Sequence, residues 1–200
     1  MSSIKASVGA LLLWTVIYAV PSLAQADAEQ PSPAAATTAR PDLPPATKLE
    51  GFDPAAGSLV TVGYDDLGSA KGVSVDVREV RDSRGETARG LVVEVHESQY
   101  RRERSLVDAD EVPELIRGID ALLQVTANPT QFKNFEVRYT TRGELRLTAF
   151  NSTIDRGIRY AVQAGRGLKA QRFLGDDDMR KLRAMFEAAT QKLSATRSPS

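Results

Sequence analysis

The stretch RGLVVEV at positions 89–95 returns as RGIRYAV at positions 156–162, and this repetition indicates how the chain is built. The shift of 67 positions (156 − 89) continues without a gap from Arg89–Ala121 to Arg156–Ala188. Within it, an alternating pattern typical of a strand and a spaced pattern typical of a helix recur together. Repetition at a fixed spacing indicates a chain built from two copies of one structural unit.

Each copy predicts four strands followed by one helix. Val73, Val75 and Val77 alternate with polar residues, the period of two that places one face of a strand in the core. The strands expected in the first copy are 59–64, 73–77, 91–95 and 102–107, with turns at 65–68 and 82–85. Those expected in the second copy are 135–139, 145–149, 158–162 and 168–174.

The helix of each copy is predicted by a stripe of apolar residues at helical spacing. The first stripe is Val112, Leu115, Ile116, Ile119, Leu122 and Leu123, and the second is Met179, Leu182, Met185, Phe186, Ala189 and Leu193. Acidic clusters precede both helices, with Asp108, Asp110 and Glu111 before the first and Asp176–Asp178 before the second. Because free amides at a helix start need acceptors, the sequence favours capping over a calcium site, whose loop pattern is missing.

These patterns predict an α+β fold of tandem duplicated ββββα units, with two antiparallel sheets that each carry one packed helix. The order resembles the whirly-type fold, in which two such units pack with their helices crossed and their curved sheets splayed. The resemblance covers roughly residues 58–193 and rests on element order and on the duplication. It implies a single-stranded nucleic acid ligand, although the basic KGKAAL-like strand signature of that family has no match in this chain.

The N-terminus has the pattern of a secretory signal. An apolar run from Val8 to Val20 is followed by Pro21 and by Ala24-Gln25-Ala26, a small-x-small cleavage site. The run is shorter than the roughly 20 residues that span a membrane. We therefore expect a signal peptide over residues 1–26, with an uncleaved anchor as the alternative. Export predicts a periplasmic or secreted protein that has no integral membrane domain after cleavage.

The rest of the chain divides by composition. Residues 27–57 are rich in Pro and Ala and lack periodic apolar residues, which predicts a disordered linker. Residues 58–195 predict a single α+β domain, with repeat halves at about 58–126 and 130–194. Residues 196–200 are expected to form a disordered tail.

The sequence offers little for catalysis. It has one histidine and no cysteine, which argues against a zinc site, and no Gly-x-Ser-x-Gly string. His96 falls on the expected outer face of a strand, in phase with Glu94, and is interpreted as a solvated side chain. Gly165-Arg166-Gly167 reads as a hairpin turn rather than a phosphate loop. We expect no catalytic residues, no metal site and no cofactor.

One charge pattern favours a binding surface. The chain as a whole has 26 basic and 26 acidic residues, but residues 130–172 contain nine basic against three acidic ones. Three arginines fall out of phase with the core residues of their strands, which predicts a shared outer face, and an aromatic residue is in phase with one of them. The candidate binding residues are Arg138, Arg146, Arg159, Lys169, Arg172 and Phe150. The alternative is an ordinary solvated sheet face.

We therefore expect an exported cell-envelope protein that acts as a non-catalytic binding or structural module, with an envelope protein as partner. The alternative function is the binding of polyanions, either extracellular nucleic acid or acidic polysaccharide, through the arginine-rich second half. The sequence leaves the oligomeric state and the identity of the ligand open.

Overall fold

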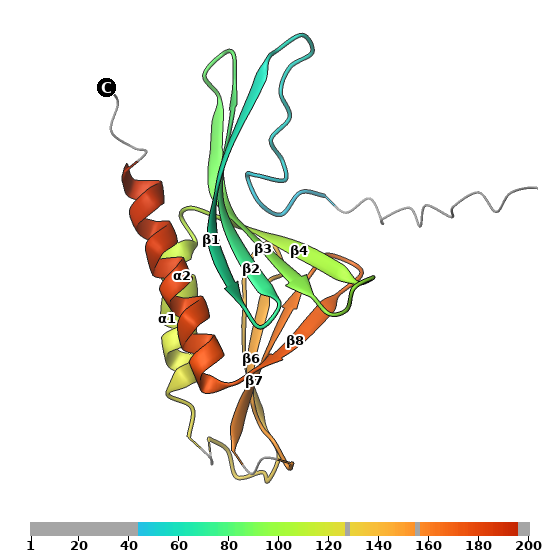
Figure 1. Cartoon of the computed structure of the whole chain (residues 1–200), viewed down its shortest axis with the longest axis vertical. Coiled ribbons are helices and arrows are strands. Elements are labelled where there is room, and N and C mark those ends of the chain that lie inside the picture. The colour runs from blue at the N-terminus through green and yellow to red at the C-terminus, as the bar shows by residue number, and fades with distance from the viewer. Residues whose placement is uncertain (1–43, 127–128, 155–156, 196–200) are drawn as a thin grey trace, which may run out of the picture. The chain divides into compact units, whose positions relative to one another are not determined.

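The structure is a computed structural model that describes residues 44–126, 129–154 and 157–195. The expected signal peptide (1–26), the first part of the expected linker (27–43) and the expected tail (196–200) lie outside the described residues. The described chain forms two four-stranded sheets and two helices (Figure 1).

Both sheets are antiparallel and follow chain order. The first sheet contains β1 (Val60–Ala70), β2 (Val73–Asp82), β3 (Thr87–His96) and β4 (Arg102–Asp108), and α1 (Val112–Leu123) follows it. The second sheet contains β5 (Glu136–Thr140), β6 (Arg146–Asn151), β7 (Ile158–Ala164) and β8 (Ala170–Leu174), and α2 (Asp176–Ala195) follows it. The α+β class and the duplicated ββββα order are confirmed.

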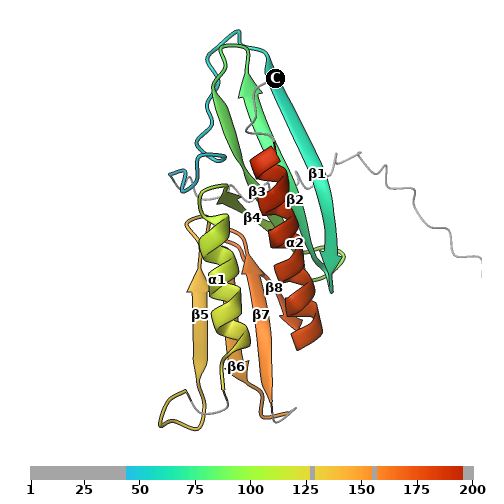
Figure 2. The same ribbon diagram turned by 90° about the vertical axis from the view of Figure 1, so that its left-hand side faces the viewer.

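Each helix packs mainly on the sheet of the other half. The helix α1, which follows the first sheet, contacts β5 and β6, whereas α2 contacts chiefly β1 and β2 (Figure 2). The two helices also contact each other, and Arg183 of α2 donates a 3.0 Å hydrogen bond to Asp120 of α1. The apolar stripes of both helices and the inner faces of both sheets form one buried cluster. The halves therefore share a single core.

The ends of the two sheets interlock through equivalent positions of the repeat. Ser105 in β4 and Arg172 in β8 are related by the shift of 67 positions (172 − 105). The Ser105 hydroxyl oxygen accepts a 3.1 Å hydrogen bond from the amide of Gly165, in the β7–β8 turn. The Arg172 guanidinium in turn donates to the carbonyl of His96, at the end of β3. Each half thus reaches into a hairpin of the other.

The segment 44–51, which we call the strap, differs from the extended linker that its composition predicts. Thr47 and Leu49 are buried, with exposed fractions of 5% and 8%. Leu49 lies over Gly90 of β3, and Arg166 of the second half donates to the carbonyl of Pro44 at 2.8 Å. The folded domain therefore includes part of the segment that the composition assigns to a linker.

The first strand is longer than predicted. Instead of ending at a turn over 65–68, β1 continues to Ala70 with a register shift between Asp66 and Ser69. The Asp66 carboxylate accepts a 2.6 Å hydrogen bond from the amide of Gly68, whose φ is +105°. A local side-chain contact of this kind also stabilises a turn. The same sequence pattern is therefore found at a turn and at a bulge within a strand.

Candidate functional site

The candidate site is the outer face of the second sheet, which points away from the shared core. The strand register places Arg138 opposite Thr148, Arg146 opposite Gln163, and Phe150 opposite Arg159. These residues alternate with core residues such as Leu147 and Val162. The prediction that Arg138, Arg146, Arg159 and Phe150 share one face is confirmed by this register.

Two aromatic rings meet on this face. The centroids of Phe150 on β6 and Phe173 on β8 lie 5.9 Å apart with an interplanar angle of 69°, an edge-to-face contact. On β7, between their two strands, Arg159 is opposite Phe150, and the residue opposite Phe173 is Ala161, which is 5% exposed. Because this residue is small, the rings can touch across it. Phe173 nevertheless remains 53% exposed and offers a ring to a ligand.

The rings and arginines border a shallow concavity of about 310 Å³. Its polar lining includes the side-chain amides of Gln163 and Gln171, which are joined by a 2.8 Å hydrogen bond. Arg138 forms an ion pair with Glu136, at the rim of the concavity. Within the described part of the chain, Arg146 forms no ion pair. The face therefore combines cationic, aromatic and amide groups in one open depression.

Lys169 and Arg172 do not belong to this face. Arg172 pairs with Val162 in the register, so its side chain leaves the inner side of the sheet and reaches His96. Lys169 lies before β8, where its ammonium group donates to Glu144 at 2.6 Å and to the carbonyl of Gly165 at 2.9 Å. The hydrogen bond from Lys169 lowers the pKa of Glu144. Both cations serve contacts within the fold.

The outer face of the first sheet carries a cluster of carboxylates. Asp66 and Asp76 lie directly opposite each other on β1 and β2, and Glu94 on β3 is diagonal to Asp76. Burial raises the pKa of Asp76, and the neighbouring carboxylates of Asp66 and Glu94 raise it further. Glu94 also pairs with His96 at 2.6 Å. The two outer faces have thus diverged in charge while the core pattern has repeated.

Replacing Asp76 by Asn is expected to stabilise the chain at neutral pH by about 0.5 kcal/mol, the usual size of a like-charge pair across strands. Because the folded-state pKa is raised, the folded state binds the proton more tightly than the unfolded chain does. Protonation of Asp76 therefore stabilises the folded state at pH values below the pKa of this group in the unfolded chain. This stabilisation is lost as the pH rises through its pKa in the folded state. The gain from Asp76→Asn should therefore vanish below about pH 4.

Urea unfolding of both proteins at about pH 3 and pH 7 measures this difference. An equal gain at both pH values, or a loss at neutral pH, would contradict the repulsion between these carboxylates.

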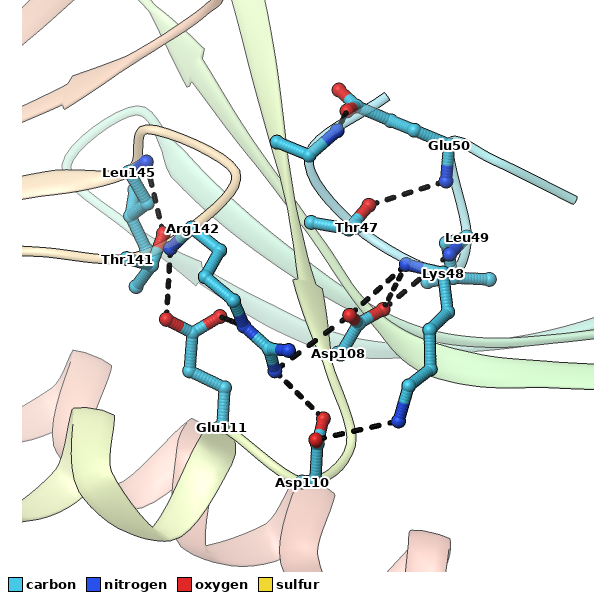
Figure 3. Close-up of polar contacts among 11 residues, drawn as sticks. Thr47, Lys48, Leu49, Glu50, Asp108, Asp110, Glu111, Thr141, Arg142 and Leu145 are labelled. Atoms are coloured by element: carbon cyan, nitrogen blue, oxygen red, sulfur yellow. Dashed lines mark hydrogen bonds and ion pairs between the residues drawn. The ribbon is translucent and has the colours of Figure 1, made fainter. Parts of the chain in front are cut away.

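The acidic cluster before α1 does not cap that helix, contrary to the prediction. Glu111 is the N-cap residue, and no side chain accepts from the first turn. The buried carboxylate of Asp108 instead accepts from the strap, at 2.9 Å from the amide nitrogen of Lys48 and 3.4 Å from that of Leu49 (Figure 3). In the first turn of α2, Asp178 does accept a 3.2 Å hydrogen bond from the amide of Gly175, the residue before the helix. The equivalent clusters therefore have different structural roles.

Arg142, in the β5–β6 turn, joins the first cluster to the second half. Its guanidinium donates to Asp110 at 2.8 Å, and its backbone amide donates to Glu111 at the same distance (Figure 3). Burial alone would raise the pKa of Asp110, but hydrogen bonds from Arg142 and Lys48 outweigh it and hold that pKa below its usual range. The cluster is thus an ion-pair clamp between the halves.

Other candidate chemistry is sparse in the described residues. Among residues 44–126, 129–154 and 157–195, no three acidic or histidine side chains are placed to hold a metal ion. None of the helices in those ranges is both long and apolar enough to cross a bilayer. The site residues that sequence reasoning missed are Phe173, Gln163 and Gln171. The alternation of the strands could have identified them, because both glutamines and Phe173 alternate with core residues.

No family model matches the chain, and no curated protein matches it.

Proposed function

We propose that this chain is a non-catalytic binding module and that its binding surface is the outer face of the second sheet. The concavity beside the Phe150–Phe173 pair carries the proposal, because Arg138 and Arg146 line the same depression. Cations that track a charged chain, next to exposed rings on which flat groups stack, suit a polyanionic ligand. Acidic polysaccharide and extracellular nucleic acid are the polyanions that fit an exported protein.

The contrast between the two outer faces supports this proposal. The first outer face mixes the carboxylates of Asp66, Asp76 and Glu94 with arginines, whereas on the second the arginines lie beside the paired rings and the concavity. The adjacent carboxylates of Asp66 and Asp76 would repel a polyanion locally, whereas the arginines of the second face would attract it. The arrangement of charges thus favours the second face in a chain whose net charge is zero.

The whirly-type resemblance belongs to this proposal as well. The duplicated ββββα order agrees with it, but fold analogy alone assigns no ligand. The cell-envelope location rests on the N-terminal sequence pattern, and an envelope protein is the alternative partner for the same face.

The proposal is tested with a triple substitution of Arg138, Arg146 and Arg159 to Ser. Retention of the chain on immobilised heparin and on single-stranded DNA should fall with salt and should be much weaker for the variant. For DNA, the slope of log affinity against log salt should decrease by about 2, because each lost phosphate contact removes roughly 0.7.

A matched control removes the same charge elsewhere. The first sheet has three exposed arginines, Arg81, Arg102 and Arg104. Their replacement by Ser should leave retention close to that of the unmodified chain, apart from the effect of the lower net charge. Equal loss for the two triple variants would show that binding follows net charge and would refute a site on the second sheet. Phe173→Ser should weaken retention without changing the charge.

A further inference from the structure

The strand β1 leaves one backbone edge open. It is the first strand of its sheet, with β2 as its only strand neighbour among the described residues. Around its first half four large side chains are exposed: Leu59 (79%), Val60 (43%), Val62 (49%) and Tyr64 (75%). Within the described part of the chain, a row of amide and carbonyl groups without a strand partner thus runs beside a row of exposed apolar side chains.

This edge lacks the usual protection against strand pairing. Soluble proteins blunt edge strands with charges, prolines, bulges or short length. In β1 the bulge and the acidic pair Asp65–Asp66 lie only in the second half of the strand. By contrast, β5 and β8 at the edges of the second sheet have five residues each, and the backbone of β4 is approached closely by the Gly143 turn. The first half of β1 is therefore an edge prepared for a partner strand.

We propose that residues 60–64 of β1 pair in antiparallel orientation with the same residues of a second copy of this chain. The two first sheets would then join into one continuous sheet around a two-fold axis, an isologous contact. In an antiparallel pair, residues directly opposite point to the same face. The outer faces of both copies must lie on the same side of the joined sheet. The residue at the two-fold axis must therefore lie opposite the same residue of the other copy.

The sequence selects Val62 as that residue. With the axis there, Val62 faces its own copy and Val60 faces Tyr64 twice, so that every pair on the outer face is apolar. An axis through Gly63 would set Val60 against Asp66. An axis through Thr61 would set Tyr64 against a residue outside the strand.

The same register avoids charge repulsion. Asp65 lies opposite Leu59 of the other copy, and neither acidic residue faces an acidic residue. Self-matching of this kind is what a second copy requires, whereas an unrelated strand would have no reason to match the pattern twice. The proposal does not involve the outer face of the second sheet, so it stands independently of polyanion binding.

A cysteine reporter tests the register directly, because the chain has no cysteine of its own. In full-length Val62→Cys the two thiols would lie opposite each other, with α-carbons about 4.5 to 5.5 Å apart, a separation that a disulfide bridges. Mild oxidation should convert this variant to a covalent dimer. The control is Tyr100→Cys, at a residue that is 89% exposed between β3 and β4, and it should remain mostly uncross-linked.

Opposite charges at the axis give a second, reversible test. Sedimentation of the unmodified chain should show a concentration-dependent dimer, whereas Val62→Lys and Val62→Glu should each be monomeric over the same range, with unchanged circular dichroism. Mixing the two variants in equal amounts should restore the dimer, because Lys then faces Glu. A monomeric unmodified chain, a dimer that survives Val62→Lys, or a mixture that stays monomeric would each overturn the proposal.

Discussion

Gly143→Ala is expected to destabilise the chain by about 3 kcal/mol, as overpacking against rigid neighbours does. A β-carbon at this position would lie 1.9 Å from the carbonyl oxygen of Leu106 and 3.1 Å from a methyl group of Thr47. The first of these atoms is backbone of β4, so no side-chain rotation relieves the clash. Either the β5–β6 turn would leave β4, or the strand itself would move.

The effect follows from contact between the halves and not from the backbone conformation, since the φ of Gly143 is not positive. Gly63→Ala is the matched control, because no atom lies within 4 Å of the added carbon and its φ is not positive either. Its stability should change by less than about 0.5 kcal/mol. Urea unfolding of both variants measures the difference, and equal stabilities would mean that the turn does not contact β4 as described.

Asp108→Ala is the second large effect, with an expected loss of about 2 kcal/mol. The carboxylate is 1% exposed and accepts from the backbone amides of Lys48 and Leu49. Without it the amides remain buried and unpaired, or the strap must leave the domain so that water can bind them. Arg142 lies 3.7 Å from the same carboxylate, so the Arg142 side chain would also be held less firmly.

Release of the strap has a direct readout, since Lys48–Leu49 is a trypsin site held by this hydrogen bond. Asp108→Ala should be cut there much faster than the unmodified chain under native conditions. Glu114→Ala is the control, because its side chain is 62% exposed and its ion pair, to Arg117, lies within α1. If Asp108→Ala resisted trypsin as well as the control, the carboxylate would not be what holds the strap.

Much of the fold is predictable because strand and helix periodicity is local. The alternation of Val73, Val75 and Val77, and the stripe from Val112 to Leu122, each identify a buried face without reference to the rest of the chain. A stripe does not say what buries it, however. Nothing in the sequence of α1 shows that it packs on the sheet of the other half, because that choice depends on the whole core.

The contacts of the strap with the acidic cluster before α1 are likewise not predictable from local sequence patterns. Asp108 lies where a helix cap is expected, but its partners are backbone amides about 60 positions away in the chain. Thr47 and Leu49 are too few to form a periodic pattern, so composition alone describes their segment as a linker. Long-range contacts of single residues leave no repeating signal.

For the candidate site, phase was a better guide than charge. The phase of Arg138, Arg146 and Arg159 predicts a shared face, and the register places them on one outer face. Lys169 and Arg172 share only the basic character of the segment, and both lie elsewhere. Counting charge identifies a basic segment, whereas only phase assigns a side to each residue of a strand.

The duplication explains why binding is proposed for one half only. Positions that repeat, such as Leu115 with Leu182, belong to the core, and the outer faces are where the halves differ. The pair Glu94 and Ala161, related by the shift of 67 positions (161 − 94), illustrates this: one is acidic, and the other is the small residue between two rings.

The most direct test is a titration of the isotope-labelled chain with a short heparin fragment, followed by amide chemical shifts. Binding on the second sheet should shift the amide signals of Arg146, Phe150, Ala161 and Phe173, and these shifts should weaken as salt is added. The repeat-related position Glu94 on the first sheet should not respond. Shifts spread equally over both outer faces, or confined to the first, would contradict the proposal that binding lies where the two halves differ.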